Sequence, residues 1–446
     1  MDTHLFREKL QPVFENFGVT CCYLFGSRAG QDYYRDSDID LAVIFADYSP
    51  STHNLELEIE LQNVVSEILA PLEVEVDLLF LQKAPIYLKF NVINTAKIIY
   101  CVDDEFRTDF EDMTIRDYLD FKPFLEMYYR EMAEDLLSKG AKLIIFNSDD
   151  MKDGAINFAR LHPDVPVIHA SGDTSWKEGK NYIELPKFGN TMGRMEYGKM
   201  IAGCAAALTT KTGQIGYLGP LINDETRRLT VSAYLGARYC YEKYAGKNPD
   251  DLKFKVTWIG FWFNIPGFTS DPTQVADEFI NSGYDVIISG IDTTEALVQA
   301  SKAKAAGKEV WAIPYDYEGA CAEAPEVCLG VPYFNWGPAY LRAVEQVKAG
   351  TFQSYFEWVG PDWTDINNRD TSAVGFVFGD ALSAEAKASL EQFIDELAGG
   401  LNLFVGPLNF QDGTPFLAEG ETATDLQVWY LPQLLEGMEG QSVAGE

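Results

Sequence analysis

The stretch Tyr23–Phe45, YLFGSRAGQDYYRDSDIDLAVIF, decides the fold of the first part of the chain. An apolar run ends at Gly26 and Ser27, and after ten further residues Asp38 and Asp40 flank an isoleucine at the start of a second apolar run. This pattern predicts strand, turn, strand. Because the side chains of a strand alternate between its faces, the two aspartates are expected to project from the same face.

Two carboxylates held this close repel each other, and such a pair persists when a cation lies between them or when they share a proton. Gly26 permits a close backbone turn, and Ser27 offers a hydroxyl and an amide to an anion. Two-metal phosphoryl transfer needs a third carboxylate on a neighbouring strand. Asp77 in VEVDLLF supplies it, and Glu75 on the same face is the alternative. The residues therefore predict a site for a magnesium nucleoside triphosphate.

The Gly-Ser, Asp-x-Asp and later strand aspartate together resemble the nucleotidyltransferase superfamily of DNA polymerase beta. The segments RDSDIDL from Arg35 and RDYLD from Arg116 resemble segments of the minimal nucleotidyltransferases, which act as antitoxins beside HEPN toxins. The resemblance covers about residues 1–137 and implies Mg²⁺ in a two-metal site, ATP as the donor and a protein tyrosine as the acceptor. It implies catalytic and metal-binding roles for Asp38, Asp40 and Asp77, and nucleotide-binding roles for Gly26, Ser27 and Arg28. The two arginines Arg28 and Arg35 either contact phosphate or balance neighbouring acidic residues.

Composition limits the classes of protein that this chain can be. The 446 residues allow two or three domains, and the apolar content of 47% excludes a disordered chain. The net charge of −33 argues against nucleic acid and anionic membranes as partners. The sequence lacks a run of the roughly 20 apolar residues that a membrane span requires.

The first residues predict an amphipathic helix with no signal-peptide pattern, so we expect a cytoplasmic protein. The cysteines lack metal-ligand spacing. Cys321 and Cys328 close a short loop and could be bridged in an oxidising compartment, whereas in a reducing cytoplasm we expect them to be free.

The rest of the first part predicts a small α+β module. Helical periodicity runs from Asn54 to Leu69, and the strand of Asp77 follows. A short helix over residues 85–92 and a strand over residues 97–101 come next. Residues 106–137 predict two helices that meet near Pro123, because proline interrupts helix hydrogen bonding.

From Ala141 onward, short apolar strands alternate with helical stretches, which predicts a doubly wound parallel sheet. Ligands of such sheets bind at the carboxyl ends of the strands. The residues that follow these strands are polar or aromatic, and they suit a flat heterocycle that stacks on a ring and donates N–H groups to a carboxylate. The predicted ligand-binding residues are Asp149, Trp262, Phe263, Asp292, Tyr315, Asp316, Asn335 and Trp336.

This second part resembles the basic membrane protein family of ABC transporter substrate-binding proteins, which have the type I periplasmic-binding-protein fold. The segments that carry the resemblance are HPDVPVIHASG from residue 162, MGRMEYGKMIAG from 192, IGYLGPLINDETRR from 215, WFNIPGF from 262, SGIDTTEAL from 289, AIPYD from 312 and FNWGPAY from 334. By this resemblance the ligand is a purine nucleoside, Trp262 or Phe263 stacks on the base, and Asp292 and Asp316 are polar anchors.

The chain departs from that family at its start, where a nucleotidyltransferase module stands in place of the first two strand-helix units. The fold class is therefore α/β, with a small α+β domain over residues 1–137 and an N-terminally truncated, doubly wound region of two lobes over residues 138–446. We expect a metal-dependent nucleotidyltransferase, with a HEPN toxin as a partner, joined to a nucleoside-binding domain. The alternative is a substrate-binding protein that serves an ABC permease and carries an inactive first domain, joined to it by an accidental gene fusion.

Overall fold

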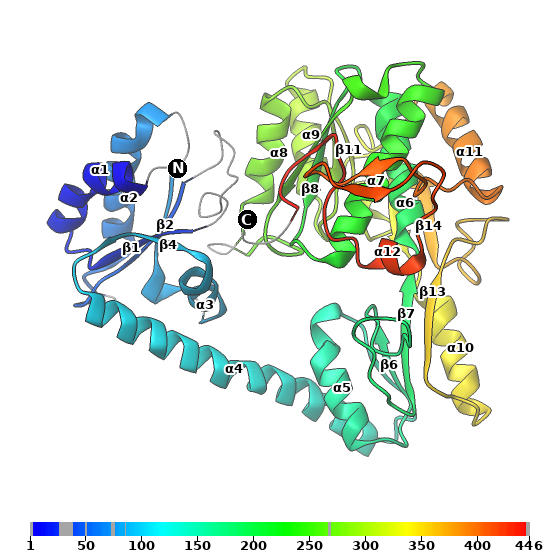
Figure 1. Ribbon diagram of the computed structural model, residues 1–446, viewed down its shortest axis with the longest axis horizontal. Helices are drawn as coiled ribbons and strands as arrows, with labels where there is room; N and C mark the ends of the chain where they lie inside the picture. Colours follow the sequence, from blue (N-terminus) through cyan, green and yellow to red (C-terminus); the bar gives the residue numbers. More distant parts are fainter. Residues whose placement is uncertain are drawn as a thin grey trace. The chain divides into compact units, whose positions relative to one another are not determined.

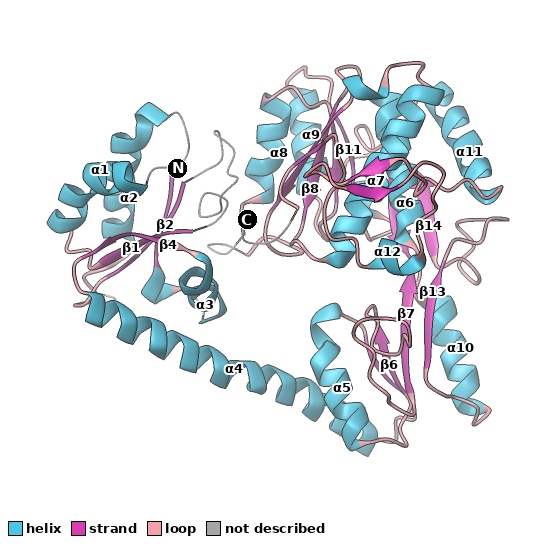
Figure 2. Ribbon diagram, viewed as in Figure 1, coloured by secondary structure: helices cyan, strands magenta, loops and turns pink. Residues whose placement is uncertain are grey.

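The computed structural model describes residues 3–25, 39–49, 51–72, 76–84, 86–265 and 269–442. They form two compact units, the first ending at Leu125 and the second beginning at Glu126. Both units mix helices with strands, as Figure 2 shows, and the predicted α/β class is confirmed.

The first unit is built on a four-stranded sheet with the strand order β3-β2-β1-β4. Its strands are β1 (Cys21–Phe25), β2 (Ile39–Ile44), β3 (Val76–Phe80) and β4 (Lys97–Cys101). β1 is antiparallel to β2 and β4, whereas β2 and β3 are parallel. The two apolar runs on either side of Gly26 and Ser27 therefore pair as neighbouring strands, as predicted.

Three helices accompany this sheet: α1 (Thr3–Asn16), α2 (Leu55–Leu69) and α3 (Ile86–Thr95), with short 3₁₀ turns at Ala70–Leu72 and Leu81–Lys83. Leu10 and Phe14 of α1, one turn apart, pack with Leu61 and Val65 of α2 in the same buried cluster. One face of α1 and one face of α2 thus pack against the sheet, as the periodicity of these helices predicts.

The expectation of two helices over residues 106–137 is wrong. The helix α4 (Asp104–Ser138) runs without a break and includes Pro123. Proline removes one backbone hydrogen bond, but the remaining bonds of a long helix continue on both sides of it. The division between the units falls within α4, and the domain boundary after residue 137 stays a prediction.

The second unit has two parallel sheets, each of which defines a lobe. The first lobe has the strand order β13-β7-β6-β5 and the second β11-β10-β8-β9-β17. The first-lobe strands are β5 (Ile144–Phe146), β6 (Val167–Ala170), β7 (Phe188–Gly193) and β13 (Tyr355–Val359). The second-lobe strands are β8 (Gln214–Gly219), β9 (Lys253–Trp258), β10 (Val286–Ser289), β11 (Trp311–Ile313) and β17 (Met438–Glu439).

Helices flank both sheets (Figure 1). They are α5 (Lys152–Leu161) and α10 (Gly337–Lys348) in the first lobe, and α6 (Met195–Thr209), α7 (Asp224–Lys243), α8 (Pro272–Asn281) and α9 (Glu295–Ala305) in the second. The remaining elements are β12 (Gly330–Phe334), β14 (Val374–Phe378), α11 (Ala384–Ala398), β15 (Leu408–Asn409), β16 (Pro415–Leu417), α12 (Asp425–Trp429) and 3₁₀ turns at Asp149–Met151, Pro249–Asp251 and Ala320–Glu323. The chain crosses between the lobes after β7, β12 and β13.

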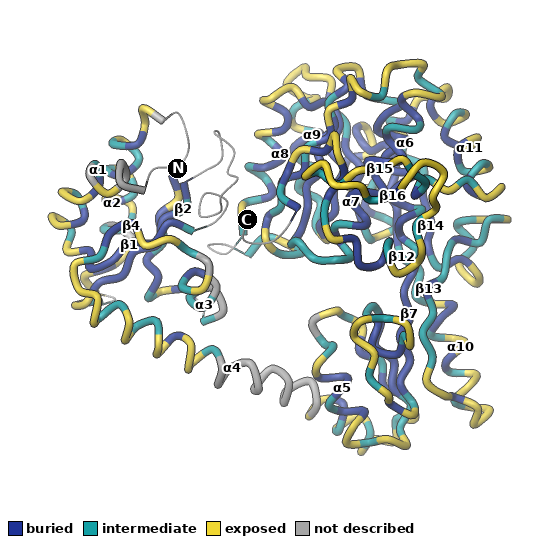
Figure 3. The backbone as a smooth tube through the Cα atoms, in the orientation of Figure 1, coloured by how far each residue is buried: buried dark blue, intermediate teal, exposed yellow. Residues whose placement is uncertain are grey.

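The first-lobe sheet is covered on both faces. Ile144 and Phe146 of β5 pack in a buried cluster with Phe158 of α5 and Ala133 of α4. Ile145, which alternates with them, packs instead beside Ala343 of α10. The C-terminal end of α4 therefore belongs to the hydrophobic core of this lobe. Figure 3 shows the buried residues along the strands of the same lobe, beside α5.

Helices α6 and α7 cross with their backbones in contact. A Cβ atom on Gly203 would lie 1.8 Å from the carbonyl oxygen of Ala233, and one on Gly236 would lie 2.1 Å from that of Met200. A disulfide between Cys204 and Cys240 joins the same two helices. Only glycine permits this approach, because any side chain at either position would overlap the opposite backbone.

Cys321 and Cys328 are bonded to each other in the structure, which is the state expected of this pair in an oxidising compartment. The loop between them brings their Cα atoms to 5.5 Å, which is within the usual range for a disulfide. A third pair, Cys21 and Cys101, joins β1 to β4. In the part of the chain that the structure describes, no helix combines the length and the apolar character that a membrane crossing requires.

Candidate functional site

A pocket of about 150 Å³ lies in the second unit where the carboxyl ends of strands from both lobes meet. It is lined by Asn147, Ser148, Asp149, Ala170, Ser171, Met192, Glu225, Trp262, Asp292, Tyr315, Asp316, Phe334 and Trp336. Parallel strands end at a common edge, so side chains from distant parts of the sequence converge there.

Two lining residues have backbone conformations that side chains seldom adopt. Ser171, which follows β6, has a φ of 73°, and Asp316, which follows β11, has a φ of 71°. The left-handed region is uncommon for residues other than glycine. Such strain concentrates at functional sites, where the surrounding structure holds it in place.

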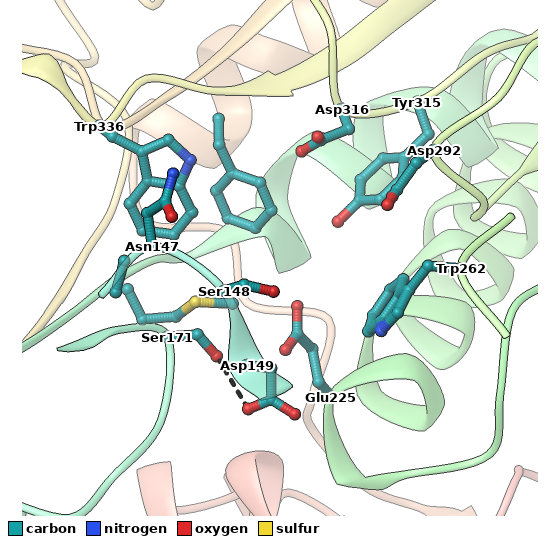
Figure 4. Close-up of a pocket in the computed structure, with 13 residues that line it drawn as sticks. Asn147, Ser148, Asp149, Ser171, Glu225, Trp262, Asp292, Tyr315, Asp316 and Trp336 are labelled. Carbon is teal, nitrogen blue, oxygen red and sulfur yellow. Dashed lines mark hydrogen bonds between the residues drawn. The ribbon is translucent and has the colours of Figure 1, made fainter. Parts of the chain in front are cut away.

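Aromatic rings form two walls of the pocket. Phe334 and Trp336 are stacked, with ring centroids 4.9 Å apart and an interplanar angle of 24°. Figure 4 shows Trp262 on the opposite side from Trp336. A flat ring between these walls would find an aromatic surface on each face.

A buried lysine lies behind Asp292 and Asp316. The Lys199 ammonium donates to the carbonyl oxygen of Ser289 at 2.7 Å and lies 3.6 Å from the ring centroid of Tyr315. Burial lowers the pKa of Lys199 well below its usual value, while Asp316 and Asp292 oppose that shift. Burial also raises the pKa of Asp316, and Lys199 opposes it. A positive charge on Lys199 favours the ionised form of Asp316 at this end of the pocket.

Glu225 is a fourth carboxylate in the pocket and lies in the first turn of α7. Asn223 caps this helix, its side chain accepting from the backbone N–H of Thr226 at 2.9 Å. Burial raises the pKa of Glu225 to about 7, with Arg228 opposing the rise and Asp149 adding to it. A group with this pKa changes its charge near neutral pH.

The first unit holds a second carboxylate pair. Asp40 of β2 and Asp77 of β3 are direct partners in the parallel register. Their neighbours Ile39 and Val76 are buried in the core cluster, so the two aspartates project from the opposite face of the sheet. The structure therefore brings these two predicted metal ligands together.

Asp38, Gly26, Ser27 and Arg28 lie outside the described residues, as do Arg35 and Glu75. Among the residues that are described, no group of three metal-ligating side chains occurs. Paired carboxylate oxygens at one level of two neighbouring strands nevertheless fit the oxygen ligands that Mg²⁺ prefers.

Residues 116–377, more than half of the chain, match the family model described as ABC transporter substrate-binding protein PnrA-like. The chain belongs to this family. Residues 8–105 match the model described as Polymerase beta, Nucleotidyltransferase. The chain thus combines a nucleotidyltransferase-like unit with a substrate-binding unit, and both predicted resemblances are confirmed.

Several known proteins are similar to this chain. A purine-binding protein of Brucella abortus is 29% identical over 64% of this chain and 72% of its own length. A protein of Haloferax volcanii, named for glucose binding by an ABC transporter, is 27% identical over 46% of this chain and 47% of its own. A solved complex of an AMPylated Shewanella oneidensis HEPN toxin with an MNT antitoxin is 23% identical, covering 30% of this chain and 98% of that one, at a TM-score of 0.22.

Six of the eight predicted ligand-binding residues line the pocket of the substrate-binding unit: Asp149, Trp262, Asp292, Tyr315, Asp316 and Trp336. Phe263 and Asn335 do not. Phe263 is 43% exposed and packs edge-on against Phe261. The Asn335 side-chain amide donates to the carbonyl oxygens of Arg369 and Ser372, so it holds a loop.

Glu225, Met192 and Phe334 are lining residues that the sequence prediction did not select. Met192 lies within β7 and Phe334 at the end of β12. The position of Glu225 could have been inferred from the sequence, because Asn223 and Thr226 form a capping box shortly after the apolar run of β8. That signal places the first turn of a helix at the strand ends.

Proposed function

We propose that the substrate-binding unit takes up a purine nucleoside or a closely related heterocycle in the pocket between its lobes. The observation that carries this proposal is the pair of aromatic walls with carboxylates between them. A purine stacks on Trp262 and on the Phe334–Trp336 pair, and its N–H and hydroxyl groups donate to Asp292 and Asp316. The name of the Brucella relative agrees with this class of ligand.

A sugar is the competing ligand, because the Haloferax relative is named for glucose. Hexoses also lie against aromatic rings and donate to carboxylates. The second aromatic wall favours the purine, since it adds a contact that a flat ring fills better than a puckered one.

Calorimetry on the full chain separates these ligands. We expect heat with adenosine, guanosine or inosine and none with glucose at the same concentration. Tryptophan fluorescence provides a second readout, because all eight tryptophans lie between residues 176 and 429, in the substrate-binding unit. A folded sample that binds glucose and no purine would overturn the proposal.

For the nucleotidyltransferase-like unit, we propose metal-dependent transfer of AMP from ATP to a protein hydroxyl, with tyrosine as the acceptor. The register pairing of Asp40 with Asp77 is the observation that favours it. Bound Mg²⁺ supplies charge neutralisation at the triphosphate and lowers the pKa of the acceptor hydroxyl. Asp40 and Asp77, with Asp38, would hold this cation against the triphosphate. The acceptor oxygen then attacks the α-phosphorus, its proton passes to water, and pyrophosphate leaves.

Incubation with α-labelled ATP, magnesium and tyrosine-bearing protein acceptors tests this activity. We expect label on protein, and mass spectrometry should place it on tyrosine as an adenylyl group. A HEPN-type toxin is the first acceptor to try. The double variant Asp38→Asn plus Asp40→Asn should lose the label, and its retention would contradict the proposed roles of these carboxylates.

A further inference from the structure

Asp149 and Glu225 approach the pocket from different lobes. Asp149 follows β5 in the first lobe and accepts a hydrogen bond from the Ser171 hydroxyl at 3.4 Å. Glu225 lies in the first turn of α7 in the second lobe. Both line the same pocket, and Figure 4 shows their carboxylates on the same side of it.

The charged groups around Glu225 are mostly of its own sign. Its neighbours are Asp149, Glu196 and Asp316, with Arg228 as the opposing cation. The Arg228 guanidinium also donates to Glu196 at 2.6 Å, so its charge is shared. The Lys199 ammonium acts mainly at the other end, on Asp292 and Asp316.

We propose that Asp149 and Glu225 form a charge filter, which accepts solutes that place hydrogen-bond donors between the two carboxylates and rejects solutes that place a negative charge there. The inference rests on the proposed function of this pocket as a solute site. It narrows the ligand class to neutral or cationic heterocycles and excludes nucleotides. The ATP that the first unit would use could not then compete for this pocket.

The filter makes the affinity for a solute depend on pH. Whether the affinity rises or falls with pH depends on the charge of the solute. Burial places the pKa of Glu225 near 7 in the free protein. A donor from the solute stabilises the ionised carboxylate, so such a solute binds more tightly as pH rises through 7. An anionic group requires the protonated carboxyl, so an anionic solute binds more weakly over the same range.

The test uses two probes of nearly equal shape, adenosine-5′-carboxamide and adenosine-5′-carboxylic acid, titrated into the full chain at pH 6 and pH 8. For a single group with a pKa of about 7, the carboxamide should gain about tenfold in affinity between these pH values and the carboxylate should lose about tenfold. The ratio of the two affinities should therefore rise by about a hundredfold.

The variant Glu225→Gln should abolish both pH dependences, and Asp149→Asn should reduce the preference for the carboxamide. Glu385→Gln is the matched control. Like Glu225, Glu385 lies in the first turn of a capped helix, but it is exposed, on α11. It should behave as the unaltered protein does.

Two results separate the possible failures. If adenosine binds but both probes show the same pH dependence, or equal affinities, the charge filter is wrong and the proposed solute site stands. If neither adenosine nor either probe binds the folded chain, the proposed solute itself is wrong and the filter falls with it.

Discussion

Each unit of the chain holds two carboxylates close together, but by different means. Asp40 and Asp77 are fixed by the backbone hydrogen bonds of neighbouring parallel strands. Asp149 and Glu225 come from separate lobes that side-chain packing and three chain crossings connect. The strand pair cannot separate without breaking a sheet. The spacing of the lobe pair is set by side-chain packing between two separate sheets, and for that reason we call this pair adjustable.

This difference decides how the repulsion is relieved. A fixed pair calls for a cation, because neither carboxylate can move away. An adjustable pair can take up a proton or a solute donor. Burial raises the pKa of Glu225 and the neighbouring Asp149 adds to the rise, so Glu225 is the carboxyl that would take up the proton. A rigid carboxylate pair suits metal chemistry, and an adjustable one suits reversible binding.

The largest expected effect comes from breaking the rigid pair. The double variant Asp40→Asn plus Asp77→Asn should lower nucleotidyl transfer by at least a factor on the order of a hundred to a thousand, since each carboxylate lost removes a preorganised contact to the reacting charge. The double variant Glu105→Gln plus Asp109→Asn, at two exposed carboxylates of the same unit, removes the same number of charges and is the control for total charge. An equal loss of nucleotidyl transfer in the control would show that the effect comes from the change in total charge and not from the loss of Asp40 and Asp77.

The next largest effect is on the stability of the contact between α6 and α7, the helix that carries Glu225. Gly236→Ala should destabilise the substrate-binding unit by about 2 to 3 kcal/mol, because the new methyl group overlaps the carbonyl oxygen of Met200. Gly360→Ala is the control, since its Cβ would meet Tyr197 at an ordinary 3.7 Å. Urea unfolding followed by tryptophan fluorescence measures both. Similar midpoints for the two variants would contradict the close helix contact.

The loss of affinity on removing one aromatic wall of the pocket should be smaller than the preceding effects but measurable. Trp262→Ala should weaken binding of the solute by about 1 to 3 kcal/mol, the range expected for loss of a stacked ring. Phe263→Ala tests the adjacent ring, which lies outside the pocket lining, and should leave affinity within a factor of about two. Calorimetry at constant pH compares them. A larger loss for Phe263 would reverse the assignment of the stacking residue.

The smallest expected effect is on the pH dependence of folding stability, measured without ligand, and it concerns Glu225 of the adjustable pair. A carboxyl whose folded-state pKa is raised favours folding below its unfolded pKa and loses that contribution as pH rises through the folded value of about 7. Glu225→Gln should therefore gain stability over the unaltered chain between pH 5 and pH 8, by roughly 1 to 3 kcal/mol. Denaturant midpoints at the two pH values measure this gain. A constant difference would show that Glu225 keeps one charge state throughout.

The sequence predicted much of the fold because its patterns are local. The alternation around Asp40 and Asp77, and the apolar runs that precede Trp262 and Asp292, specify strands and their polar ends without any distant contact. Local patterns do not show where a distant contact engages a side chain. Asn335 follows a strand as the residues that line the pocket do. Its side-chain amide, however, donates hydrogen bonds to a loop more than thirty residues later in the chain.

The continuity of α4 shows the same limit. Pro123 is a sound local reason to end a helix, and the structure carries α4 past it to pack Ala133 into the first-lobe core. Glu225 was overlooked for a related reason. A glutamate in the first turn of a helix is ordinary, and only the lobe opposite makes it part of a pocket.

The crossing of α6 and α7 has a practical consequence for protein engineering. Two glycines and a disulfide lock these helices backbone to backbone. A designer who wishes to turn the second unit into a fluorescent sensor should leave this crossing untouched and place dyes or altered specificity on the loops after β5, β9 and β11. Those loops can be rewritten one at a time, because the fixed crossing keeps α7 in place on the second-lobe sheet while they change.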